Sequence, residues 1–390
     1  MLRNRREGDD QIQYERFRFD LREASGALGD LGTLLPLMLG TIAVVGMAPT
    51  PVLLGFAISY IATAFWYRLP IPVQPMKAVA AVLLTAEMTP ASLAASGVMI
   101  GAVLLILGGT GWIDRLGQLV PQSLLAGLQL GLGVALALVG LDLVGTAPVL
   151  GVTLVALLAV LLRFPWLPAA AIAVVCAMFS GWAFDLEPLP VADAAGVMPA
   201  LVGLPSWQEV EQGFAVFVLP QLALTLTNAI ILTALIAGDY FGAAARHVTP
   251  RRLSISSGLG NLLLAPFGAL PMCHGAGGVA AHHRFGARTG GAPLMLGAAL
   301  LLVALAPGGA GLALLAEIPA AGLGALLLIA SCELAVSRRL FDCKPSCYPV
   351  IGATALATVL ADPFIGLVAG TIGEVGRMAL VRALRRMSSR

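Results

Sequence analysis

Long stretches of this chain carry no charged residue. Two of them are residues 124–141 (LLAGLQLGLGVALALVGL) and 291–306 (GAPLMLGAALLLVALA). A helix needs roughly 20 mostly apolar residues to cross the hydrocarbon core of a bilayer, where the backbone must satisfy its own hydrogen bonds. Over the whole sequence, 58% of the residues are hydrophobic and 11% are charged. These values exclude a soluble domain and predict an all-α polytopic membrane protein.

Hydropathy and length divide the chain into 14 expected segments. Two of them, near 75–88 and 273–284, are too short to cross the membrane and follow proline-containing stretches. The remaining segments are expected to be spans near 24–46, 51–67, 93–111, 121–143, 147–162, 167–184, 213–237, 252–267, 291–307, 311–333, 348–361 and 363–381.

Positive charge is distributed unevenly between the two sides of these predicted spans. With the N-terminal tail (1–22) in the cytoplasm, the basic loop residues and the C-terminal tail (383–390) fall on the cytoplasmic side. The acidic loop at 188–212 then lies outside and contains neither Lys nor Arg. This is the positive-inside pattern, and Lys77 is its exception. We expect a multi-pass protein of the cell (inner) membrane with both termini cytoplasmic and no signal peptide.

The chain also contains a weak internal repeat. A shift of 198 residues places Asp30 on Asn228, Pro75 on Cys273 and Pro121 on Pro319. The expected first repeat is 23–187 and the second is 213–382, with seven segments in each. Because seven is odd, the second repeat would run through the membrane in the opposite direction, as in many secondary transporters. The sequence thus predicts two inverted seven-segment repeats.

Each repeat is interrupted by an irregular stretch. These stretches are RLPIPVQPMKA (68–78) and APFGALPMCHGAGG (265–278), and their prolines forbid helix before each short helix begins. Irregular backbone inside a membrane must face protein or a wet cavity. Inverted symmetry would bring the two helix N-termini together near the midplane, where their free N–H groups and positive dipole ends favour an anion.

Several polar side chains are candidates for this site. Lys77 lies in the first turn of the first short helix. There an anionic ligand would offset the free-energy cost of a charged ammonium group inside the membrane. The alternative is a lysine whose side chain extends to the membrane interface. Asp30 could carry a proton or contact the ligand. Alternatively, it could pair with Lys77 or cap a kink in the helix. Gln221, Thr225 and Asn228 form a polar stripe on the eighth segment, which could line the site or hold helices together.

Histidine and cysteine residues support no metal or disulfide prediction. His274 follows Cys273, but the next histidines, His282 and His283, are two turns further on and are expected to point toward the cytoplasm, so the spacing for a metal site is poor. His274 could instead donate to the ligand or titrate near neutral pH. The five cysteines are expected to be ordinary thiols, and no cofactor is expected.

Three motifs resemble one family. GALGDLGTLLPL (26–37), PVQPMKA (72–78) and FGALPMCHGAGGVAAHHRFGARTGGA (267–292) are similar to the molybdate transporters of bacteria, algae and plants, a branch related to the SulP sulfate permeases. The resemblance implies two inverted seven-segment repeats with two half-helices, as in uracil-type transporters. It also implies a core domain (segments one to four and eight to eleven) and a gate domain formed by the others.

The family also implies where the ligand binds. It would lie between the two half-helices, with the first and eighth segments closing the pocket. The residues at these positions are Gln74, Met76, Lys77, Cys273, His274, Gly275, Asp30, Thr33, Gln221, Thr225 and Asn228. Two features depart from related permeases. The first is that no STAS domain is expected after the last span. The second is that the eighth segment has no acidic residue at mid-depth. Asp30 and His274 are therefore the candidates for carrying a coupling proton.

The leading hypothesis is a secondary active transporter that imports a tetrahedral oxyanion, molybdate first, by alternating access. Sulfate or another oxyanion, a nucleobase on the same fold, and a channel are alternatives. An intramembrane enzyme using Cys273, His274 and Asp30 is a remote alternative, because adjacent residues on one helix diverge by about 100 degrees. The expected partners are the oxyanion, the lipid bilayer and a coupling ion, with a proton favoured. A homodimer is left open, and no nucleic acid is expected.

Overall fold

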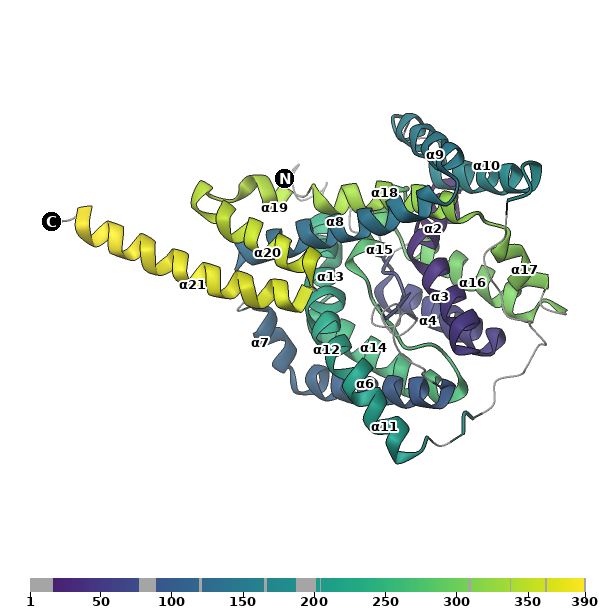
Figure 1. Ribbon diagram of the computed structural model, residues 1–390, viewed down its shortest axis with the longest axis horizontal. Coiled ribbons are helices and arrows are strands. Elements are labelled where there is room, and N and C mark those ends of the chain that lie inside the picture. Colours follow the sequence, from purple (N-terminus) through teal and green to yellow (C-terminus); the bar gives the residue numbers. More distant parts are fainter. Residues whose placement is uncertain are drawn as a thin grey trace, which may run out of the picture.

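The computed structural model describes residues 17–76, 89–118, 121–164, 167–186, 201–203, 205–307, 310–336, 338–361 and 363–388. The described chain is mostly helical, as expected (Figure 1). The helices of the first half are α2 (Leu21–Gly29), α3 (Leu31–Val45), α4 (Pro49–Tyr67), α6 (Pro90–Thr110), α7 (Trp112–Gln118), α8 (Gln122–Gly145), α9 (Pro148–Leu161) and α10 (Ala169–Ala183). The helices of the second half are α11 (Trp207–Gly213), η1 (Phe214–Val218), α12 (Leu219–Leu224), η2 (Thr225–Leu232), α13 (Thr233–Phe241), η3 (Gly242–Ala245), α14 (Pro250–Leu264), η4 (Ala265–Phe267), α15 (Ala276–Arg284), α16 (Gly291–Leu305), α17 (Ala310–Ala316), α18 (Ala320–Ala335), α19 (Arg338–Asp342), η6 (Pro345–Cys347), α20 (Tyr348–Leu360) and α21 (Pro363–Ser388).

The predicted spans coincide with helical segments, to within a few residues at most ends. Among the described residues, four helical stretches are long and apolar enough to cross a bilayer alone: α4, α6, α8 and Thr225–Ala245. The shorter apolar helices are Pro148–Leu161, Ala169–Ala183, Gly291–Leu305 and Pro345–Leu360.

Two predicted spans are interrupted. The span expected over 24–46 is divided at Asp30 into α2 and α3. The expected helix over 311–333 consists of two helices, α17 and α18, which are bent by 65° at a short break. Pro319 is extended at the start of α18 (φ −60°, ψ 140°). Because proline has no N–H and crowds the preceding turn, the helix from α17 cannot continue through it. In the first half, Pro121 likewise lies directly before α8, and the short helix α7 ends at Gln118.

The two irregular stretches meet in a short antiparallel ladder. β1 (Gln74–Pro75) pairs with β2 (Met272–Cys273), with Gln74 opposite Cys273. The Met76 N–H extends the pairing by donating to the Pro271 carbonyl at 2.9 Å. The second half-helix, α15, therefore begins at Ala276, three residues later than expected. The first expected half-helix falls mostly on residues 77–88, outside the described residues.

Several elements of the two halves are separated by the predicted 198 residues. This holds for both ends of β1 and β2, for both ends of α7 and α17, and for the first residues of α8 and α18. These matches agree with the proposed repeat. The inversion of one half relative to the membrane, and the repeat boundaries, stay predictions.

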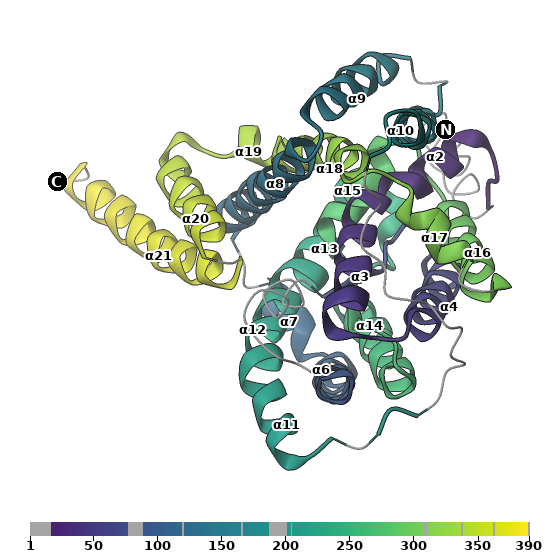
Figure 2. The same cartoon turned by 45° about the vertical axis from the view of Figure 1, so that its right-hand side comes forward.

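Helices of one half pack beside helices of the other. α4 lies along α16, α6 along α14 and α8 along α18, while α20 packs on α8 and α21. Figures 1 and 2 show α9 and α10 on one flank and α20 and α21 on another, outside the group formed by α3, α4, α6 and α12 to α16. These flanking helices expose large apolar side chains, such as Val149 (84% exposed) and Trp182 (77%). Exposed apolar faces of this kind are typical of contact with lipid.

Candidate substrate site

Asp30 lies at the break between α2 and α3, and its side chain is fully buried. Its Oδ2 accepts a hydrogen bond from the Tyr60 hydroxyl and its Oδ1 accepts one from the Gln74 amide, each at 2.5 Å. A buried carboxyl group needs such donors to offset the loss of water. The alternative that the Asp30 side chain caps the kink is wrong, because it makes no hydrogen bond to the first turn of α3.

Gln74 connects Asp30 to the start of α15. Gly275 is the N-cap of α15 and has no side chain with which to cap this helix end. The Gln74 amide occupies the space that a Cβ on Gly275 would fill. A Cβ on Gly278 would lie 2.6 Å from Gln74 Nε2 and 2.7 Å from Asp30 Oδ1. The first turn of α15 therefore approaches these two polar side chains so closely that glycine is required at both positions.

His282 lies one turn further along α15 and is fully buried, so the expectation that it points toward the cytoplasm is wrong. Its Nδ1 is 2.8 Å from the Gly26 carbonyl oxygen. Its Nε2 is 3.7 Å from Asp30 Oδ2. The physical reason for the error is that α15 is covered by α2, α8, α13 and α18, which enclose this part of the helix.

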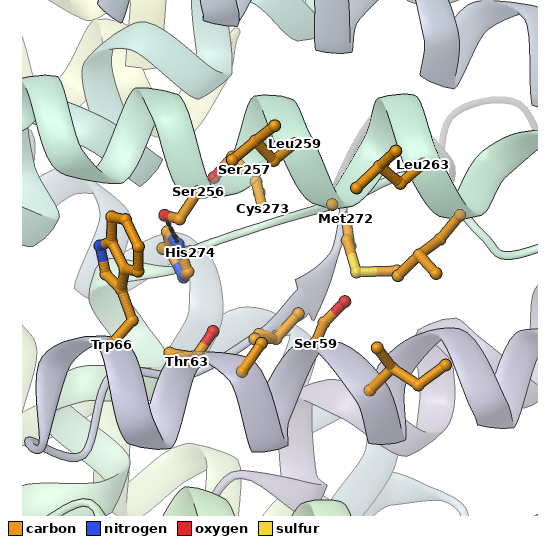
Figure 3. A pocket seen from close by; sticks show the side chains of 15 residues that line it. Ser59, Thr63, Trp66, Ser256, Ser257, Leu259, Leu263, Met272, Cys273 and His274 are labelled. Atoms are coloured by element: carbon orange, nitrogen blue, oxygen red, sulfur yellow. Dashed lines mark hydrogen bonds between the residues drawn. The ribbon is translucent and has the colours of Figure 1, made fainter.

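His274 and Cys273 occupy a different place. They line a cavity of about 270 Å³ between α4 and α14, which Asp30, Gln74 and Gly275 do not line (Figure 3). His274 Nδ1 lies 2.8 Å from the Pro72 carbonyl oxygen, and its Nε2 lies 2.7 Å from Ser256 Oγ. Because a carbonyl can only accept, Nδ1 carries the proton and Nε2 accepts from Ser256 in the neutral ring. Both ring nitrogens are thus bonded within the protein.

The polar stripe of the eighth segment is buried as well. Gln221 Nε2 donates to Thr225 Oγ1 at 2.8 Å, so these two side chains bond to each other. Asn228 is buried, and within the described part of the chain its Oδ1 has no hydrogen-bond partner. Thr225 and Asn228 belong to η2, a π-helical turn that packs against α14 and α15. Such turns are rare and frequently lie at functional sites.

The remaining expected site residues are Met76, Thr33 and Lys77. Met76 and Thr33 are buried, and the Thr33 N–H donates to the Asp30 carbonyl at 3.0 Å. Lys77 lies outside the described residues, so its predicted role and its pairing with Asp30 stay predictions.

The structure therefore brings Asp30, Gln74 and Gly275 into one cluster and places His274 and Cys273 beside it. Sequence reasoning missed Tyr60 and the burial of His282. A phenol hydroxyl in an apolar span needs a buried partner, and this was the available signal for Tyr60. No group of three or more His, Cys, Asp or Glu in the described ranges could hold a metal ion.

Comparisons with known proteins agree with this architecture. The family described as "Molybdate transporter of MFS superfamily" matches residues 22–136 and 213–334. "Molybdate transporter 2" of Arabidopsis thaliana is 28% identical over 90% of this chain and 86% of its own length. "Molybdate transporter 1" of Chlamydomonas reinhardtii is 29% identical over 94% of this chain and 93% of its own.

Two solved structures share the fold. The transmembrane domain of the cyanobacterial bicarbonate transporter BicA superposes with a TM-score of 0.60 at 18% identity, over 90% of this chain and 99% of that one. The murine anion transporter Slc26a9, in an inward-facing state, gives 0.58 at 15% identity, over 94% of this chain and 69% of that one. The fold is therefore the SLC26/SulP-like one that the resemblance implied.

Proposed function

This chain belongs to the molybdate transporter family, and from that premise we propose that it is a secondary active transporter that imports molybdate across the inner membrane. The curated relatives named above are molybdate transporters, not enzymes. In this proposal both termini are cytoplasmic, in agreement with the positive-inside pattern of the sequence. The proposed cargo is a tetrahedral dianion that has lost part of its water.

The observation that carries the proposal is the uncapped N-terminus of α15. The first N–H groups of a helix lack partners within the helix, and the N-cap residue, Gly275, has no side chain to bond them. Gly275 and Gly278 have no Cβ, so Gln74 and Asp30 lie against the backbone of this helix end. Inward-pointing N–H groups at the positive end of a helix dipole are a typical binding site for an oxyanion.

We assign the surrounding roles as follows. Gln74 donates through Nε2 to Asp30 and places Oε1 against Gly275, so it positions the carboxyl group. Lys77 follows β1 by two residues and supplies the cation. Asn228, whose buried amide oxygen has no hydrogen-bond partner among the described residues, is assigned to the site from the eighth segment. The direct ligands are thus backbone N–H groups and Lys77, while Gln221 and Thr225 support the wall.

Calorimetric titration of the purified protein tests this proposal. Molybdate and tungstate are expected to bind, sulfate to bind more weakly, and phosphate and uracil not to bind. Gly275→Ala is expected to weaken molybdate binding by roughly tenfold or more, because its Cβ displaces the Gln74 amide. Lys77→Ala should weaken it at least as much, since a charged donor is lost.

Gly352→Ala is the matched control, because a Cβ at Gly352 meets nothing within 4 Å. Its affinity should equal that of the wild type. Binding of uracil without any oxyanion would replace this proposal with the nucleobase carrier, and unchanged molybdate affinity in Gly275→Ala would remove the α15 N-terminus from the site.

A further inference from the structure

Two buried titratable side chains face each other behind the start of α15. Asp30 and His282 each have no exposed side-chain surface, and Asp30 Oδ2 lies 3.7 Å from His282 Nε2. His282 Nδ1 lies 2.8 Å from the Gly26 carbonyl oxygen. Because a carbonyl oxygen only accepts, Nδ1 must carry a hydrogen in every protonation state of this ring.

The tautomer of His282 has a direct consequence. In the neutral ring Nε2 holds a lone pair, and it has no hydrogen-bond partner among the described residues. It then faces a carboxylate oxygen, which is also an acceptor. Two acceptors that face each other in a buried place are unfavourable, because the Nε2 lone pair is left without a donor. A proton between them would satisfy both groups at once.

From this geometry we propose that Asp30 and His282 form one proton site, which is loaded when the anion binds. The inference rests on the proposed function and adds the coupling ion and its carrier. Without the added proton the pair carries the negative charge of Asp30; with it the pair is neutral. A dianion that approaches the α15 N-terminus is repelled in the first state and not in the second.

The helix itself links the proton site to the anion site. A Cβ on Gly278, in the first turn of α15, would touch Asp30 Oδ1, and His282 is four residues later on the same face. Gln74 contacts both Asp30 and Gly275, so one amide lies between the carboxyl group and the proposed anion position. About two turns of α15 therefore connect the proposed anion position with the proposed proton site.

The elements packed around His282 carry other titratable groups. On α2, Glu23 accepts from the backbone N–H groups of Arg288 and Thr289, and Arg22 is exposed. On α13, Tyr240 stacks on His283 at 4.3 Å. Tyr60 on α4 donates to Asp30. The further titratable residues of the surrounding elements are Asp142, Asp239, Arg284, Cys332 and Glu333.

The test is the number of protons taken up when molybdate binds. It is measured calorimetrically near neutral pH in two buffers that differ in ionisation enthalpy. The wild type should take up about one proton per molybdate ion. Asp30→Asn and His282→Gln should take up none; Gln at 282 keeps a donor for Gly26 but cannot titrate. His283→Gln, a change in the adjacent ring, should behave like the wild type.

A second measurement uses proteoliposomes that enclose a pH-sensitive dye. An inward molybdate gradient should acidify the lumen with wild-type protein. Asp30→Asn, whose side chain stays neutral, should exchange labelled molybdate without acidification. Wild-type protein that binds molybdate with no proton uptake overturns the inference and leaves the proposed function intact, whether or not the variants fold. Acidification by Asp30→Asn equal to that of the wild type also overturns it. Failure of wild-type protein to bind any oxyanion overturns the proposed function instead.

Discussion

Asp30 places a carboxyl group beside the helix end at which we propose an anion binds. Tyr60, Gln74 and His282 surround it, and together they supply two hydrogen bonds and one facing ring nitrogen. The α15 dipole stabilises the carboxylate in the absence of an anion. A dianion therefore competes with Asp30 for the same positive end, and a proton on the Asp30–His282 pair relieves this competition.

His274, the other expected proton carrier, has a structural role at the residue scale. Tyr67, Ser256, His274 and Pro72 form one chain of hydrogen bonds beside β2. Figure 3 shows the contact between Ser256 and His274. We predict that His274→Ala lowers the free energy of unfolding by about 1–3 kcal/mol, because it leaves buried partners unsatisfied. The pH dependence of molybdate uptake should keep its midpoint. Thermal unfolding and uptake assays over a pH series measure both quantities, and a shifted midpoint would return His274 to the list of proton carriers.

At the scale of elements, the close pairing of α8 with α18 holds the two halves together. A Cβ on Gly324 would lie 2.7 Å from the Gly140 carbonyl oxygen and 2.7 Å from the Val144 nitrogen. Both are backbone atoms, so the helices would have to separate to admit it. In membrane proteins such small-residue contacts replace the hydrophobic effect as a source of helix association.

We predict that Gly324→Ala destabilises the protein by about 1–3 kcal/mol through overpacking at this crossing. Gly145→Ala is the control, because a Cβ at Gly145, the last residue of α8, meets nothing within 4 Å. The control should be neutral or slightly stabilising, since alanine is the better helix former. Thermal unfolding in detergent measures both variants. Equal unfolding temperatures for the two would contradict the close packing of α8 and α18.

At the scale of the whole molecule, transport by the proposed mechanism requires α9, α10, α20 and α21 to move against the core helices. One hydrogen bond joins these parts at the start of α10, where the Ala170 N–H donates to Ser25 Oγ of α2 at 2.9 Å. A short contact between the two parts is a place where a covalent link would stop relative motion.

We predict that a Ser25→Cys, Ala170→Cys variant loses molybdate exchange in proteoliposomes when it is oxidised and regains it on reduction. Molybdate binding should be retained in both states. The background should replace Cys176, Cys332, Cys343 and Cys347 by alanine, and Ser25→Cys alone serves as the control. Full exchange by the cross-linked protein would show that the core does not move against the gate at this contact.

The sequence predicted the helical segments and the two irregular stretches before the half-helices. Its errors lie in features that depend on how the helices pack. The bend before α18 follows from Pro319, although hydropathy alone joins α17 and α18 into one span. The β1–β2 ladder was not expected, because a two-residue strand depends on a partner 198 residues away. The burial of His282 depends on four surrounding helices, which no local pattern reveals.

By itself, the sequence determined that the chain is a helical membrane protein with two broken segments, because hydropathy and the geometry of proline and glycine belong to each residue wherever it lies. Tertiary structure alone decided which polar groups meet. Asp30, Tyr60, Gln74 and His282 come from four elements spread over most of the chain. Their contact depends on how those elements pack, and the strength of a buried hydrogen bond or charge depends on that contact and on the exclusion of water.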